Sequence, residues 1–172
     1  GETPATYDPI YAQQIGDQTI LNHLYENLMR LEKGENGQTT AVPGAAKSVD
    51  MKENSDGTVT YTFRLRGGKW SDGVEVKASD FVYAWQRLAD PATGSVYAPL
   101  LSIVSGYAEA QASGDMSLLA VSAKSSTTLV VTLTGHYDWF LREVCTSIAT
   151  MPLRQDVVPV SYTHLRAHET VL

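Results

Sequence analysis

The sequence has little cysteine, no long apolar run and less positive than negative charge. Cys145 is the single cysteine in 172 residues, which excludes an internal disulfide framework. No stretch is long and apolar enough to predict a helix that spans a membrane. The formal net charge is −6, from 13 Lys and Arg against 19 Asp and Glu. We therefore expect no nucleic-acid partner, because the chain lacks a basic surface that would attract phosphates.

Groups suited to catalysis or metal binding are also scarce. Cys145 follows the apolar Val144, which predicts a buried and unreactive thiol. His164 and His168 have the spacing of metal ligands on one helix face. However, Leu165 stands where the hydrolase motif has a glutamate, and no third ligand is near. We predict no metal, no other cofactor and no enzymatic activity.

The residues that are present predict a folded core with a β-hairpin. Hydrophobic residues make up 43% of the chain, which argues against wholesale disorder. Residues 49–53 and 58–66 form the two arms, and Asp56-Gly57 supplies the positive φ that a tight turn needs. The second arm alternates apolar and polar residues, which is typical of a half-buried strand. Its apolar residues are Val59, Tyr61, Phe63 and Leu65.

Helical periodicity appears between the strand patterns. A helix is expected from Asp17 to Leu28, and a second from Ala78 to Leu88 with Phe81, Val82 and Trp85 on one face. Weaker or shorter helices are predicted over residues 97–104, 107–112 and 139–145, and a strand pair over 120–123 and 128–134. Helices mixed with an antiparallel hairpin favour a mixed α/β fold, of the α+β kind, over a uniform parallel sheet.

Three consecutive blocks resemble the signature of one protein family. They are Tyr61-Thr-Phe-Arg-Leu-Arg66, Lys69-Trp-Ser-Asp-Gly73 and the stretch from Lys77 to Pro91. Their order and spacing resemble those of the extracellular solute-binding proteins of family 5, which include oligopeptide, dipeptide and nickel receptors. Weaker matches lie at residues 7–9, 22–28 and 43–46, and residues 85–97 resemble the oligopeptide branch most. The resemblance covers residues 1–158.

The resemblance implies a partial fold of the periplasmic-binding-protein type II kind. Residues 1–25 would be a stub of the first large lobe, and residues 26–151 the smaller α/β lobe. Residues 152–158 would begin the return to the large lobe. Residues 159–172 differ in character and resemble translated sequencing-adapter sequence, so we interpret them as a non-native tail.

The resemblance also implies peptide-binding residues. Carried over by position, they are Gln13, Gln14 and Ile15, which would pair with peptide backbone, and Tyr97. Gln13 replaces an acidic residue that is usual in the family, so charge-based selectivity is not expected to transfer. Tyr97 offers an apolar ring and a hydroxyl, although ordinary loop packing is the alternative interpretation of this side chain.

The function implied is the substrate-binding component of an ABC importer that binds oligopeptides. The expected partners are the peptide and the importer's membrane subunits, with the receptor itself a monomer. Its expected location is periplasmic or on the cell surface through a lipid anchor. Three alternatives stay open: a family receptor for a dipeptide, murein peptide or nickel chelate; an enzyme, for which no nucleophile–base pair is found; and an adhesion or chaperone-like surface role.

Overall fold

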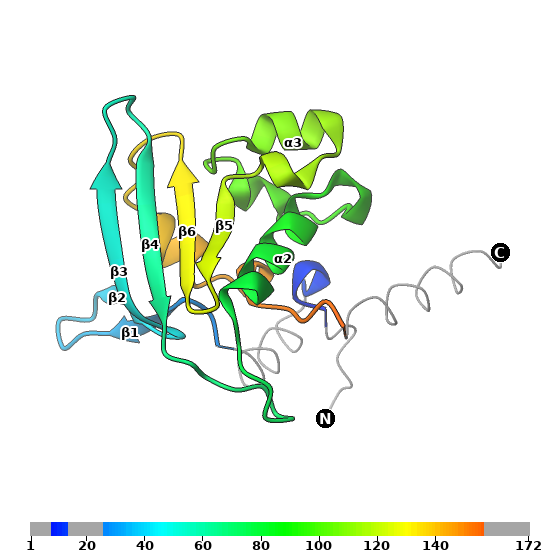
Figure 1. The fold of residues 1–172 in the computed structure, drawn as a ribbon. Coiled ribbons are helices and arrows are strands. Elements are labelled where there is room, and N and C mark those ends of the chain that lie inside the picture. The colour runs from blue at the N-terminus through cyan, green and yellow to red at the C-terminus, as the bar shows by residue number, and fades with distance from the viewer. Residues whose placement is uncertain (1–7, 14–25, 157–172) are drawn as a thin grey trace.

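The computed structural model describes residues 8–13 and 26–156 (Figure 1). They form a four-stranded antiparallel sheet, a separate two-stranded hairpin, and helices that pack beside the sheet. This is the mixed α/β fold that the sequence predicts. Among these residues, no helix has the length and apolarity needed to cross a membrane.

The larger sheet has the strand order β3-β4-β6-β5, with β3 at Ala46–Glu53, β4 at Val59–Leu65, β5 at Val121–Ser125 and β6 at Thr128–Leu133. Both predicted strand pairs are confirmed. The turn between β3 and β4 forms as expected, because Gly57 has a φ of +86° and Asp56 Oδ1 accepts from the Thr58 amide at 3.0 Å. The odd-numbered residues of β4 are buried and the others more exposed, as the alternation predicts.

The core lies between this sheet and helix α2, which spans Ala78–Ala89 and contacts β5 and β6 (Figure 1). Phe81, Trp85 and Leu88 are fully buried, and Val82 is partly buried. Phe140 lies at the centre: its ring centroid is 4.7 Å from that of Tyr61 and 6.3 Å from that of Trp85. Aromatic contacts thus join the sheet to α2.

The smaller helical elements connect these layers. Helix α3 spans Tyr107–Ser113, and a π-helical turn, η5, spans Phe140–Val144. The 3-10 turns are η1 (Pro9–Tyr11), η2 (Pro91–Thr93), η3 (Ala98–Leu101), η4 (Met116–Leu118) and η6 (Ile148–Thr150). The predicted helix over residues 97–104 is therefore only one short turn. The predicted helix from Asp17 lies mostly outside the described residues, and Leu28, its expected last residue, sits in a bend.

The two-stranded hairpin was not expected from the sequence. Strands β1 (Met29–Lys33) and β2 (Thr39–Pro43) pair around the turn at residues 34–37. Apart from Met29, the residues of β1 are exposed, so the strand shows no apolar alternation. The Met29 amide donates to the Cys145 carbonyl at 3.1 Å, which ties the hairpin to η5.

Candidate functional site

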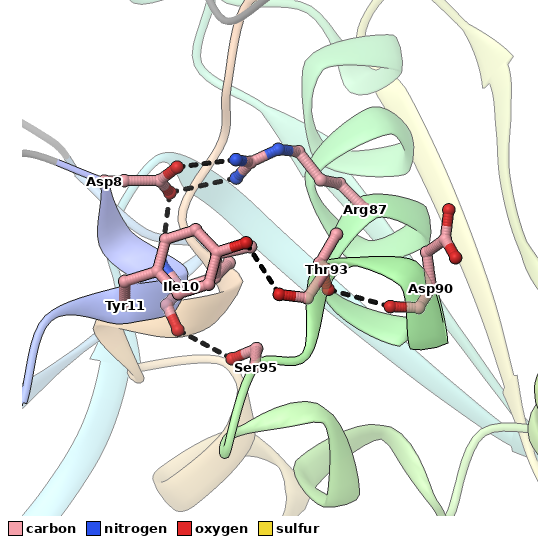
Figure 2. A network of polar contacts seen from close by, with 7 residues as sticks. All are labelled: Asp8, Ile10, Tyr11, Arg87, Asp90, Thr93 and Ser95. Carbon is pink, nitrogen blue, oxygen red and sulfur yellow. Dashed lines mark hydrogen bonds and ion pairs between the residues drawn. The ribbon is translucent and has the colours of Figure 1, made fainter. Parts of the chain in front are cut away.

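The candidate site is built on residues 8–13, a short segment that lies against the end of α2 and the loop that follows it (Figure 2). Asp8 caps the turn η1, because its Oδ1 accepts from the Ile10 amide at 3.4 Å. Pro9 fixes the backbone at the first position of this turn, and Ile10 is fully buried in the core. Gln13, at the end of the segment, is exposed.

A buried ion pair fixes the start of the segment. Arg87, in the last turn of α2, donates from Nη1 and Nη2 to the two carboxylate oxygens of Asp8, at 2.9 and 2.5 Å (Figure 2). The side chains are only 8% and 18% exposed. Burial by itself would lower the pKa of Arg87, but the hydrogen bonds and charge of Asp8 outweigh it and leave that pKa raised. The two-pronged geometry suits a guanidinium and a carboxylate.

Hydroxyl groups hold the rest of the segment. The Tyr11 hydroxyl donates to the Thr93 carbonyl at 2.7 Å, and Ser95 Oγ donates to the Ile10 carbonyl at 2.6 Å (Figure 2). The Tyr11 ring also lies near the guanidinium, with Arg87 Cζ 5.9 Å from its centroid. Residues 8–11 are therefore attached at several points to the stretch that ends at Ser95.

Tyr97 makes the last of these attachments. Its hydroxyl donates to the Ala12 carbonyl at 2.7 Å, and its amide donates to Ser95 Oγ at 3.2 Å. Tyr97 thus contacts the residue immediately before Gln13, which is another of the predicted site residues. The predicted residues Gln14 and Ile15 lie outside the described residues. Tyr97 is half-buried.

A shallow hollow of about 360 Å³ adjoins Tyr97. Exposed apolar side chains line it, among them Val96, which is 63% exposed, and Trp139, which is 42% exposed. Glu143 contributes a carboxylate to the lining. Sequence reasoning missed Val96 and Trp139, because a single exposed apolar residue carries no signal until the fold places another beside it.

A second hollow, of about 1090 Å³, lies between the start of β1, the loop over residues 68–72 and residues 151–154. Arg154 and Asp72 both line this hollow, and the Arg154 side chain donates hydrogen bonds to Asp72 and to Asp156. The Asp72 Oδ1 also accepts from the Val74 amide at 3.1 Å, so this carboxylate holds its own turn. Arg154 therefore fastens the outgoing chain to this loop.

Within residues 8–13 and 26–156, no three or more His, Cys, Asp or Glu side chains gather in a way that could hold a metal ion. His164 and His168, along with the rest of the predicted tail, fall outside that part of the chain. Cys145 is fully buried, and burial raises the pKa of its thiol well above the usual value. The predicted burial of this thiol is confirmed, and its lack of reactivity stays a prediction.

Comparisons with known proteins agree with this architecture. The chain is 36% identical over 146 residues to the periplasmic murein peptide-binding protein MppA of Escherichia coli, covering 81% of this chain and 25% of that protein. It is 39% identical over 157 residues to a dipeptide-binding protein of Lactococcus lactis, covering 83% of this chain and 26% of that protein.

The chain is also similar to solved structures of oligopeptide-binding proteins. The Haemophilus influenzae OppA in complex with RPPGFSPFR matches with a TM-score of 0.77 and 34% identity, over 93% of this chain and 30% of that one. The substrate-binding domain of an oligopeptide ABC transporter from Bacillus anthracis matches with a TM-score of 0.79 and 32% identity, over 91% and 29%. The chain thus spans about a quarter of the length of the curated relatives that it matches.

The family model for bacterial extracellular solute-binding proteins, family 5 Middle, matches residues 40–162, which is most of the chain. The match includes the three blocks between Tyr61 and Pro91 that carry the resemblance to this family. The chain belongs to family 5 of the bacterial extracellular solute-binding proteins.

Proposed function

We propose that this chain is part of the substrate-binding component of an ABC importer that takes up oligopeptides. Relatives named as peptide-binding proteins support the proposal, and so does a solved neighbour in complex with a peptide. The observation that supports it most is the hydrogen bond from the Tyr97 hydroxyl to the carbonyl of Ala12, the residue before Gln13. We further propose that the protein binds its solute without transforming it.

Tyr97 has a defined chemical preference in this arrangement. A phenol has a single proton, and Tyr97 donates it to the Ala12 carbonyl at 2.7 Å. The phenolic oxygen is then left as an acceptor. It suits an N–H group of a peptide better than a carbonyl. Every peptide has such groups whatever its side chains, which fits a receptor of broad specificity.

The exposed end of the segment supplies a second kind of contact. Gln13 would present backbone groups to an extended peptide, and Gln14 and Ile15 would continue that edge. The apolar hollow beside Tyr97 would accept a peptide side chain against Val96 and Trp139. Side-chain recognition of this sort is undemanding, because contact with an open apolar surface tolerates many shapes.

The remaining parts of the receptor follow from the family. We propose that residues 26–151 form the smaller lobe and residues 1–25 part of the first large lobe, to which residues 152–158 return. The rest of the peptide site would lie on the remaining lobe portions. The receptor would act as a monomer, in the periplasm or anchored to the cell surface, and pass its peptide to the importer's membrane subunits.

Titration calorimetry with tri- to pentapeptides tests this proposal. The intact receptor is expected to bind them with micromolar Kd, and this chain alone weakly or not at all, because most of the site lies elsewhere. Tyr97→Phe should weaken binding by about fivefold, the equivalent of one net hydrogen bond of about 1 kcal/mol. Tyr107→Phe is the matched control, because the Tyr107 hydroxyl makes no hydrogen bond to the described residues.

A different solute in the same family is the second candidate. It is favoured by relatives named for murein peptide and dipeptide binding. Competition among tripeptides, dipeptides, a murein tripeptide and a nickel chelate on the intact receptor separates the cases. If only the chelate binds, the oligopeptide assignment fails.

A further inference from the structure

We infer that Arg87 is a positioning residue for peptide binding: through Asp8 it sets where the Ala12 carbonyl meets the Tyr97 hydroxyl, although it contacts no peptide itself. This inference rests on the proposed function. It concerns a residue for which the sequence alone predicts no role beyond its place in the block from Lys77 to Pro91. The contacts of Arg87, Asp8 and the loop to Tyr97 carry the inference.

The first step is the placement of Arg87. It lies three residues after the fully buried Ala84, on a helix packed against the sheet, so its guanidinium is carried by the rigid core. A buried guanidinium needs a partner, because removing it from water without one is costly. Asp8 meets that need with both carboxylate oxygens. Asp8 therefore has one well-defined position relative to α2.

The second step runs from Asp8 along the segment. The turn η1 joins Asp8 to Ala12 through short-range hydrogen bonds, from the Tyr11 amide to the Asp8 carbonyl at 3.1 Å and from the Ala12 amide to the Pro9 carbonyl at 3.5 Å. Pro9 restricts the backbone further. A displacement of Asp8 is thus transmitted to the Ala12 carbonyl.

The third step is the pair of hydroxyl groups, on Ser95 and Tyr97, that bind the backbone of this segment. The carbonyls of Ile10 and Ala12 are two residues apart, and they accept from the hydroxyls of Ser95 and Tyr97, which are also two residues apart. Ser95 Oγ accepts from the Tyr97 amide as well, so it links these two contacts. The two hydrogen bonds, from Ser95 to Ile10 and from Tyr97 to Ala12, form together only when residues 8–12 are in one position along this loop. The Asp8–Arg87 pair fixes that position.

The consequence concerns the phenolic proton of Tyr97. In the position observed, the proton goes to Ala12 and the oxygen accepts from the ligand. If the segment shifts, the proton is free to point at the ligand, and the preference for N–H groups is lost. Arg87 would in this way affect affinity from a distance, without lining the site.

Arg87→Lys tests the inference, because it keeps the charge and loses the two-pronged hydrogen bonding. Arg64→Lys is the matched control: Arg64 also pairs with an aspartate, Asp50, but on the exposed face of the sheet. Hydrogen exchange of the Tyr11 and Ala12 amides is measured in this chain. Peptide Kd is measured in the intact receptor, at a temperature where every variant is folded.

We expect Arg87→Lys to speed exchange at Tyr11 and Ala12 by about tenfold while amides of β4 and β6 exchange as in the wild type. We expect peptide Kd to rise by at most about fivefold, the effect of Tyr97→Phe, and the effects of Arg87→Lys and Tyr97→Phe to be less than additive, because both act on one hydroxyl. Arg64→Lys should change neither quantity. Asp8→Asn should reproduce the result, and replaces Arg87→Lys if that variant does not fold.

Unchanged exchange at Tyr11 and Ala12 in folded Arg87→Lys would overturn the inference, as would a Kd equal to that of the wild type. A receptor that binds no peptide at all contradicts the proposed function. The exchange measurement still decides in that case whether Arg87 positions the segment.

Discussion

The side-chain amide of Asn27 donates a hydrogen bond to the Thr150 hydroxyl at 3.0 Å, although 123 residues separate them. Asn27 Nδ2 also donates to the Ser147 carbonyl at 2.6 Å, and Asn27 Oδ1 accepts from the Leu28 amide at 2.7 Å. Both side chains are buried. The indole of Trp85 donates to the Thr150 carbonyl at 3.0 Å, which ties this junction to the core.

Asn27→Asp should lower the free energy of unfolding by about 3 kcal/mol at neutral pH. An ionised carboxylate cannot donate, and it would face the Ser147 carbonyl at short range. Asn36→Asp is the control, because Asn36 is exposed in the β1–β2 turn. Its Oδ1 accepts from the Gln38 amide, and its Nδ2 donates only to the exposed Gln38 side chain, at 3.3 Å. Urea unfolding measures both. Equal stability of the two variants would contradict the role given to Asn27.

Gly106→Ala should be much more destabilising than Gly114→Ala. Both glycines have positive φ, +80° and +76°, so both variants carry the backbone cost of about 1–2 kcal/mol. A Cβ at Gly106 would also lie 1.9 Å from the Leu118 carbonyl oxygen, whereas at Gly114 it would meet nothing within 4 Å. The difference in thermal stability isolates the steric part. Similar melting temperatures would mean that η4 can move away.

Cys145 should not react with a thiol reagent in the folded chain at mildly alkaline pH. It is fully buried, and burial raises the pKa of its thiol, so accessible thiolate is scarce. Unfolding in guanidinium should release one reactive thiol per chain. Rapid, complete reaction without denaturant would show that η5 opens readily. Measuring the rate against denaturant concentration yields the free energy of that opening.

The Arg154–Asp72 contact should make the free energy of unfolding depend on pH in the acidic range. Hydrogen bonds from the Arg154 side chain and the Val74 amide lower the pKa of Asp72 from its ordinary value of 3.8. A lowered pKa in the folded state stabilises the fold above that ordinary value, and the contribution disappears as pH falls through the lower, folded-state pKa.

Thermal melts of Asp72→Asn and the wild type should therefore differ near neutral pH and converge in strong acid. In an Arg154→Gln background, Asp72→Asn should have a smaller effect, because the partner is already gone. A constant difference between the two melting curves at all pH values would exclude the ionised carboxylate as the cause.

The sequence predicts the elements whose residues face the core. Alternation in Val59, Tyr61, Phe63 and Leu65 identifies β4, because that strand has one buried face. Strand β1 gives no such pattern. Its residues after Met29 are all exposed, so pairing with β2 through the backbone defines it, and backbone pairing leaves little mark on side-chain type.

The candidate site could be predicted in part. The family resemblance points to Tyr97 and to the segment at Gln13, and the structure places Tyr97 beside Ala12. That either contacts a peptide stays a prediction. The Asp8–Arg87 pair could not be found by pattern alone, since 79 residues separate its members. The available signal was a charged residue directly before Leu88 on a helix with a buried face.

The hydrogen bond between Asn27 and Thr150 also brings together the two ends of the folded unit that lies between them in the sequence. The chain enters the unit at Asn27 and leaves it at Thr150, which are in contact. A longer loop elsewhere in the unit therefore need not change the distance between these two residues. At this junction side-chain hydrogen bonds, rather than strand pairing, join the two ends of the unit. A change in the length of the exposed β3–β4 turn should therefore leave the distance between Asn27 and Thr150 unchanged.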